Sequence, residues 1–130
     1  METEILISTY TRAQALEDGE LIDVTTTARE AGFRWPAAVT RALWADIAAI
    51  PAERSLEDVS GRLWDVLWMG WVALRMAKVG TSVLTYRLIL NLEGAIYDGD
   101  QDGPFYTVKV MCGLGDDGKP VLTFMRPGED

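Results

Sequence analysis

The strongest constraint on how this chain can fold is an apolar, tryptophan-rich segment near its middle, residues 63–76. Ser55 and Asp58 give the S-x-x-D pattern of a capping box ahead of it, and Arg75 follows near its end. Acidic residues at a helix start and basic residues at its end both favour the helix dipole. The segment therefore predicts one long helix that ends at Gly80 and is apolar over more than half of its circumference.

Three tryptophans share one side of this predicted helix, because Trp64, Trp68 and Trp71 are spaced at i, i+4 and i+7. A helix that is apolar almost all round is usually buried, which is the first interpretation. The second is that one edge of the tryptophans stays open to bind a partner, since Trp is enriched among binding hot spots. The third is a homodimer that shares this helix, with Gly70 allowing a second backbone to approach closely.

Ahead of this helix, the first part of the chain predicts short elements. Residues 4–8 and residues 21–24 are typical of short strands. Between them, Thr11 is expected to cap a helix over residues 12–18, and Gly19 is expected to end it in the left-handed conformation that glycine adopts easily.

Two more short helices are expected before the long one. Thr27 begins a T-x-x-E capping-box pattern, and Gly32 is expected to end that helix. Pro36 suits the first turn of the next helix. Apolar residues follow at helical spacing from Val39, and Pro51 is expected to close the helix.

The periodicity changes after residue 82. Residues 83–92 are rich in β-branched and aromatic side chains, residues 105–111 alternate between two faces, and residues 121–125 form a third short run. Turns rich in Gly and Asp separate them. The fold class is therefore predicted as α+β, in one domain over residues 1–130: short N-terminal helices and one long apolar helix packed on a C-terminal antiparallel sheet of three or more strands.

Composition excludes several functions. The 130 residues carry a net charge of −8, no histidine and one cysteine, Cys112. Serine–histidine and cysteine–histidine catalysis and a Cys/His zinc site are therefore impossible within the chain. Nucleic acids and anionic membranes bind clustered Lys and Arg, which an acidic chain does not favour. We expect a cytoplasmic protein without a cofactor, whose partner is another protein rather than nucleic acid or a membrane.

Aspartates in two loops are further candidates. Asp98, Asp100 and Asp102 form the front half of a calcium loop, D-x-D-x-D-G. Lys109 stands where such a loop has its bidentate glutamate, so these aspartates are only weak metal candidates. The alternative interpretation is a solvent-exposed turn, which Asp and Gly also favour. Residues 113–118 match G-x-G-x-x-G but precede a strand, and are predicted to be a hairpin loop.

That hairpin loop also contains two acids, Asp116 and Asp117. Together with the aspartates of residues 98–102 they predict an acidic end of the molecule. This end is either a solubilising rim or a surface that binds a basic groove on a protein that handles nucleic acid. The candidate partner-binding residues are therefore Asp98, Asp100, Asp102, Asp116, Asp117, Trp64, Trp68 and Trp71.

Three segments carry a family resemblance: YTRAQALEDGELIDVTTTAREAGFRWPAAVTRALW, GRLWDVLWM and CGLGDDGKPVLTFMRPGED. They resemble an uncharacterised bacterial family of small proteins that are often encoded on plasmids and other mobile elements. This family tends to have Pro where the chain has Leu114. The resemblance implies no activity and no catalytic residue. It implies a genomic setting in which small acidic proteins inhibit host defence, as anti-CRISPR and anti-restriction proteins do.

Together these observations predict a non-enzymatic, protein-binding accessory factor of a mobile element. Its sharper form is an inhibitor of a host nuclease or defence complex that acts through the acidic surface. The first alternative is a homodimeric structural or regulatory module that uses the tryptophan face of the long helix. The second alternative is a small enzyme that uses paired carboxylates, which would need a cleft with perturbed acid pKa values.

Overall fold

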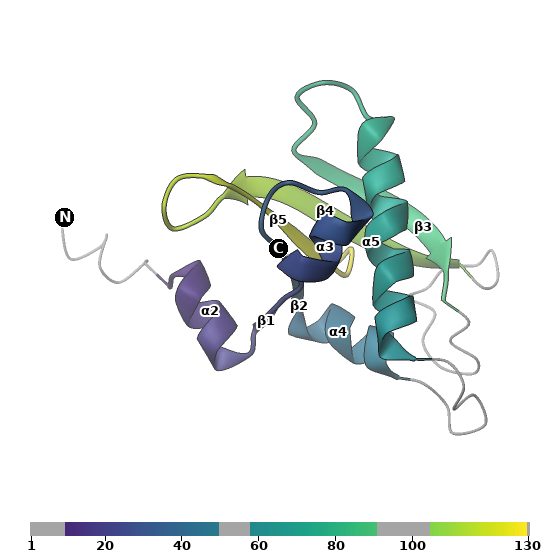
Figure 1. Ribbon diagram of the computed structural model, residues 1–130, viewed down its shortest axis with the longest axis horizontal. Coiled ribbons are helices and arrows are strands. Elements are labelled where there is room, and N and C mark those ends of the chain that lie inside the picture. Colours follow the sequence, from purple (N-terminus) through teal and green to yellow (C-terminus); the bar gives the residue numbers. More distant parts are fainter. Residues whose placement is uncertain (1–9, 50–57, 91–104, 130) are drawn as a thin grey trace.

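The structure, a computed structural model, describes residues 10–49, 58–90 and 105–129. The predicted strand at residues 4–8 and the loop with Asp98, Asp100 and Asp102 lie outside the described residues. The chain has an α+β fold, as predicted (Figure 1). The elements in chain order are α2 (Arg12–Asp18), β1 (Leu21–Asp23), α3 (Thr25–Ala31), β2 (Ala37–Thr40), α4 (Arg41–Ala48), α5 (Val59–Arg75), β3 (Val83–Ile89), β4 (Phe105–Leu114) and β5 (Pro120–Met125).

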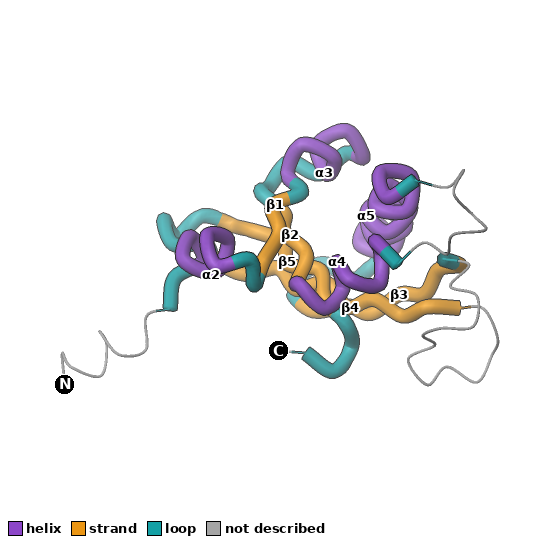
Figure 2. Tube along the Cα trace, turned by 90° about the horizontal axis from the view of Figure 1, so that it is seen from below, coloured by secondary structure: helices purple, strands orange, loops and turns teal. Residues whose placement is uncertain are grey.

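The described strands form one sheet of five strands in the order β1-β2-β5-β4-β3. The predicted antiparallel meander of β3, β4 and β5 is confirmed. It is extended by β2, which runs parallel to β5 with Val39 opposite Phe124, and by β1, which pairs antiparallel with β2. Helices α3 and α5 lie on the same side of this sheet (Figure 2).

Helix α5 packs closely on the sheet through Gly70. A Cβ atom at this position would lie 2.9 Å from both a ring carbon of Phe124 and the hydroxyl of Tyr86. The Tyr86 hydroxyl donates a hydrogen bond of 2.6 Å to the carbonyl of Val66, which fixes the helix to β3. Gly70 is therefore used for packing within one chain, and its predicted role in bringing two copies together is wrong.

Local capping signals start and end the helices, and for α2 they act as predicted. The Thr11 hydroxyl accepts the amide of Gln14 at 3.0 Å, and the Gln14 side chain accepts the amide of Thr11 at 2.9 Å. Gly19 ends that helix with φ 81°. Helix α5 differs from the prediction at its start: Asp58 was expected in the first turn after a capping box begun by Ser55, but it is itself the N-cap, and its carboxylate accepts the amide of Gly61 at 2.6 Å. Ser55 lies outside the described residues. These signals act over three or four residues, so they do not depend on tertiary contacts.

Two other helix starts were predicted wrongly. Helix α3 begins at Thr25, not after Thr27. Its N-cap residue, Val24, has no capping side chain, and the carboxylate of the preceding Asp23 accepts the amide of Thr25 at 3.1 Å. Its end at Gly32 is confirmed, with φ 119°. Residues 37–40, predicted as helical, form β2 instead. Pairing with β5 makes this strand, and such long-range pairing overrides local helix propensity.

The end of α5 also differs from the prediction, since the helix ends at Arg75 and not at Gly80. Gly80 has φ 92° in the turn that follows. In that turn the hydroxyl of Thr81 donates to the carbonyl of Lys78 at 2.7 Å. No helix in the described part of the chain is both long and apolar enough to cross a bilayer.

Candidate functional site

The tryptophan row, defined as Trp64, Trp68 and Trp71, is a continuous stack along α5. The ring centroids of Trp64 and Trp68 are 6.0 Å apart with an interplanar angle of 7°, and those of Trp68 and Trp71 are 5.1 Å apart with an angle of 16°. The guanidinium of Arg75 lies 4.6 Å from the centroid of the Trp71 ring. The predicted i, i+4, i+7 spacing thus yields one stacked unit.

The tryptophan row is neither fully buried nor fully open. Trp68 is 39% exposed, whereas Trp64 and Trp71 are half-buried and pack against the core. Trp71 also lies against the end of α3, since a Cβ atom on Gly32 would come within 2.6 Å of its indole nitrogen. The sequence left burial and exposure as alternatives, and in the structure the two outer rings are half-buried while the middle ring, Trp68, is exposed.

An apolar groove of about 660 Å³ adjoins the row at the C-terminal end of α5. One wall is the loop between α3 and β2, and the other is the turn between α5 and β3. Residues of β4 and β5 also line it. Its lining includes the aromatic and aliphatic side chains Phe33, Trp35, Trp71, Leu74, Val79 and Leu122.

The wall that carries Trp35 is held at both ends. Phe33 is buried and packs edge-on against Phe124, with ring centroids 5.8 Å apart. On the other side, the carbonyl of Pro36 accepts the amide of Leu122 at 2.9 Å. Trp35 nevertheless leaves 43% of its surface exposed. The loop therefore presents an exposed indole from a backbone fixed on both sides.

Three cations line the groove: Arg34, Arg75 and Lys78. Among the described residues, no acidic side chain lines the groove. The ion pairs within this part of the chain involve other residues than these three cations. Cys112 also lines the groove, and its partial burial raises the pKa of the thiol above its usual value. Arg34 and this positive groove were not predicted from the sequence, because the segments that line the groove are far apart in the chain.

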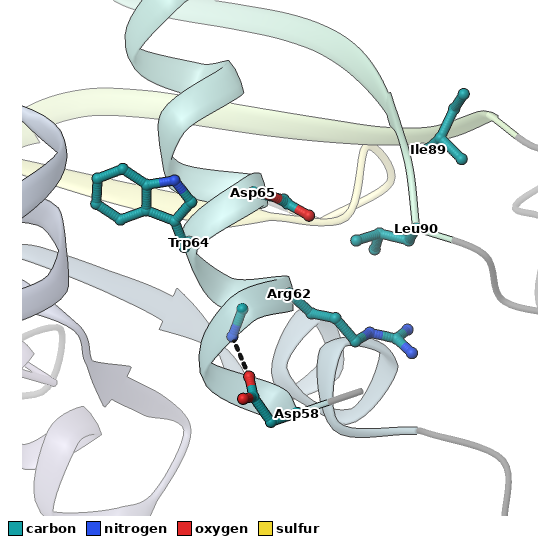
Figure 3. A pocket seen from close by; sticks show the side chains of 7 residues that line it. Asp58, Arg62, Trp64, Asp65, Ile89 and Leu90 are labelled. Carbon is teal, nitrogen blue, oxygen red and sulfur yellow. Dashed lines mark hydrogen bonds between the residues drawn. The ribbon is translucent and has the colours of Figure 1, made fainter. Parts of the chain in front are cut away.

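A second pocket, of about 350 Å³, lies at the start of α5 (Figure 3). Trp64 and Asp65 project to different sides of the helix there, and Asp65 has its pKa raised by burial. The other described carboxylate of this pocket belongs to Asp58 and caps the helix. The pocket therefore lacks a second unengaged carboxylate among its described residues, and acid–base catalysis by a pair has no support there.

The predicted aspartates of the hairpin between β4 and β5 have local structural contacts. Asp116 accepts the backbone amides of Arg12 and Ala13 at 2.9 Å each, which tethers the start of α2 to the hairpin. These amides lower the pKa of Asp116. Asp117 accepts the amide of Lys119 at 3.0 Å within the loop. Both aspartates remain exposed, so they stay candidates for contact with a partner.

Within residues 10–49, 58–90 and 105–129, no three His, Cys, Asp or Glu side chains gather in a way that could hold a metal ion. The weak calcium candidates Asp98, Asp100 and Asp102 are outside these segments, so they remain a prediction.

A buried ionic cluster was not anticipated from the sequence. Asp46 of α4 is 1% exposed, and Arg126 donates to its two carboxylate oxygens at 2.9 and 2.7 Å. The hydroxyl of Tyr106 also donates to this carboxylate. Burial and that hydrogen bond raise the pKa of Tyr106. The cluster is largely closed to solvent and joins α4, β4 and the segment after β5, which is a structural role.

Comparisons place the chain among known sequences only at the level of a family. No significant match was found among curated proteins or among solved structures. The model of one family matches residues 1–130, and that family is described as a family of unknown function, DUF6573. The chain therefore belongs to the DUF6573 family.

Proposed function

We propose that this protein is a non-enzymatic binding protein that engages another protein through the tryptophan row. The observation that carries the proposal is the exposed indole of Trp68 at the centre of a three-ring stack. Tryptophan is enriched among the residues that dominate binding energy. Large, rigid aromatic rings supply much apolar contact area to an interface, and here the middle ring is part-exposed.

The stack also favours binding for an entropic reason. Trp64 and Trp71 hold Trp68 from both sides, and Trp71 is itself held against Gly32. A side chain that is already ordered loses less conformational entropy when a partner covers it. The apolar groove beside the row enlarges the surface available to the partner.

The test is affinity capture from a bacterial lysate by three tagged proteins: wild type, Trp68→Arg and the control Val83→Arg. Val83 is 48% exposed on β3 and lies outside both the row and the groove. We expect one protein to be captured by wild type and by the control and to be lost with Trp68→Arg. Equal capture by all three proteins contradicts the proposal, and so does recovery of the protein's own copies alone.

A second candidate is the inhibitor of a host defence complex that the family resemblance suggested, acting as an accessory factor of a mobile element. The net charge of −8 and the exposure of Asp116 and Asp117 support it. Because Asp116 also holds α2, Asp117→Asn is the cleaner test. If binding to the captured protein is independent of salt and survives this change, the acidic surface is not the contact.

A further inference from the structure

We infer that the groove at the C-terminal end of α5 receives a short acidic segment of the partner protein, with an apolar or aromatic side chain among its acids. The inference rests on the proposed function, since it specifies the chemistry of the segment that binds beside the tryptophan row. Two observations carry it: a local excess of positive charge on an acidic protein, and apolar walls that are already ordered.

The charge of the groove is opposite to that of the whole chain. Arg34, Arg75 and Lys78 bring three positive charges, and no described acidic side chain lines the groove. The C-terminal end of α5 contributes roughly −0.5 charge, so about +2.5 remains. The chain as a whole carries −8. A positive patch on an otherwise negatively charged protein attracts and orients an anionic segment of a partner.

The apolar part of the groove calls for more than charge in its ligand. Trp35 presents an exposed indole on one wall, and Trp71 and Leu74 come from α5. An isolated acid would leave this surface in contact with water, whereas an apolar side chain placed between acids would bury it. The walls need little ordering, because the turn after α5 is tied through Thr81 and Lys78.

Single-stranded nucleic acid is the competing anionic ligand with flat rings. Its phosphates need cations that follow the strand over several nucleotides. Here the described cations are confined to one groove of about 660 Å³, which is the size of a site for a small ligand or a few residues. On a chain with net charge −8, a long polyanion would be repelled elsewhere. A short acidic peptide, by contrast, contacts only the positive groove and not the negatively charged remainder of the surface.

The first experiment selects ligands from a displayed library of random dodecapeptides on the full-length protein. We expect the selected peptides to be enriched in Asp and Glu next to Phe, Trp, Leu or Ile. Oligodeoxythymidylate of twelve nucleotides serves as the nucleic-acid probe. Enrichment of basic or uncharged peptides, a lack of any enrichment, or tighter binding of the oligonucleotide than of the selected peptides would overturn the inference.

The second experiment locates the binding with a matched pair of variants. Arg34→Glu/Lys78→Glu reverses two groove charges, and Arg29→Glu/Lys119→Glu makes the same change in net charge at exposed residues outside the groove. We expect the groove variant to bind the selected peptide at least roughly tenfold more weakly, whereas the control changes affinity about twofold or less. An equal loss in both variants would show that only overall charge matters, and the groove would not be the site.

Cys112 provides a direct footprint, since it is the one cysteine of the chain and lines the groove. Bound peptide should slow its alkylation by iodoacetamide in wild type and leave the rate unchanged in the groove variant. If saturating peptide does not slow the alkylation of Cys112, the peptide does not bind in the groove.

Trp68 does not line the groove. If Trp68-dependent capture persists while acidic peptides fail, this inference falls and the proposed function stands.

Discussion

Asp46 and Arg126 lie 80 residues apart in the chain and form a two-point ion pair, with nitrogen–oxygen distances of 2.9 and 2.7 Å. The carboxylate is almost fully buried, whereas the Arg126 side chain is 39% exposed. Removing the arginine would leave a buried negative charge with the Tyr106 hydroxyl as its remaining described side-chain donor. This ion pair therefore attaches the segment after β5 to helix α4.

We therefore expect Arg126→Met to lower the free energy of unfolding by about 2–4 kcal/mol, since an uncompensated buried charge is costly. Urea denaturation followed by circular dichroism measures this. The control is Arg41→Met, which removes an exposed ion pair with Glu20 and should cost about 1 kcal/mol or less. If the free energy of unfolding falls equally in the two variants, the buried ion pair stabilises the fold no more than the exposed one does.

Gly70 and Gly61 both lie within α5 and should respond oppositely to alanine. At Gly70 the new methyl group would meet Phe124 and Tyr86 at 2.9 Å, so we expect a loss of about 1–3 kcal/mol in spite of the better helix propensity. At Gly61 it would meet only the Asp58 carboxylate at 3.1 Å, and the effect should be neutral or stabilising. Thermal unfolding of both variants decides; a stabilised Gly70→Ala would refute the close packing.

The tryptophan row should give an exciton signal in circular dichroism, because ring centroids 6.0 and 5.1 Å apart are close enough for the indole transitions to couple. Trp68→Ala removes the middle ring and both stacking contacts, so the signal should disappear. Trp64→Ala leaves the pair of Trp68 and Trp71 and should keep part of it. The loss of stability for Trp68→Ala is expected at about 1–3 kcal/mol, for two ring pairs. An unchanged spectrum would contradict the stack.

The anchoring of α2 should depend on pH. The amides of Ala13 and Arg12 donate to Asp116 and hold its folded pKa below the unfolded value of roughly 4. A carboxyl group of this kind stabilises the fold above its unfolded pKa, and the contribution is lost as pH falls through the folded pKa. The amide signals of these two residues in nuclear magnetic resonance should therefore shift below roughly pH 4.

The matched control for this pH dependence is Asp116→Asn, in which no carboxyl group titrates at the start of α2. The same amide signals should then stay constant through the acidic range. If the amides of Ala13 and Arg12 do not titrate in wild type down to pH 2, or titrate equally in the variant, Asp116 does not anchor the helix.

Much of the fold could be read from local signals in the sequence. The cap at Thr11 and the helix ends at Gly19 and Gly32 were predicted, because each depends on atoms only a few residues apart. The alternation in β4 likewise indicated its two faces, with Tyr106 and its alternate residues buried. The spacing of the tryptophans was sufficient to place them on one side of α5.

Other features required the tertiary structure, because they join segments that are distant in the chain. Ala37–Thr40 reads locally as helix and becomes a strand because β5 supplies its hydrogen-bonding partner. Gly70 could face a second copy or its own sheet, and only the packing against Phe124 decides this. The burial of a particular carboxylate cannot be predicted from the sequence either, because the residues around Asp46 in the chain do not distinguish it from an exposed acid.

The sequence by itself determined the fold class, the C-terminal meander, the tryptophan row and the exclusion of histidine and zinc chemistry, because these follow from short-range periodicity and composition. Only the tertiary structure decided that Trp68 is the exposed ring and that Arg34 and Lys78 line one groove. Exposure and charge density depend on which distant segments pack together, and that depends on the free energy of the whole fold rather than on any local pattern.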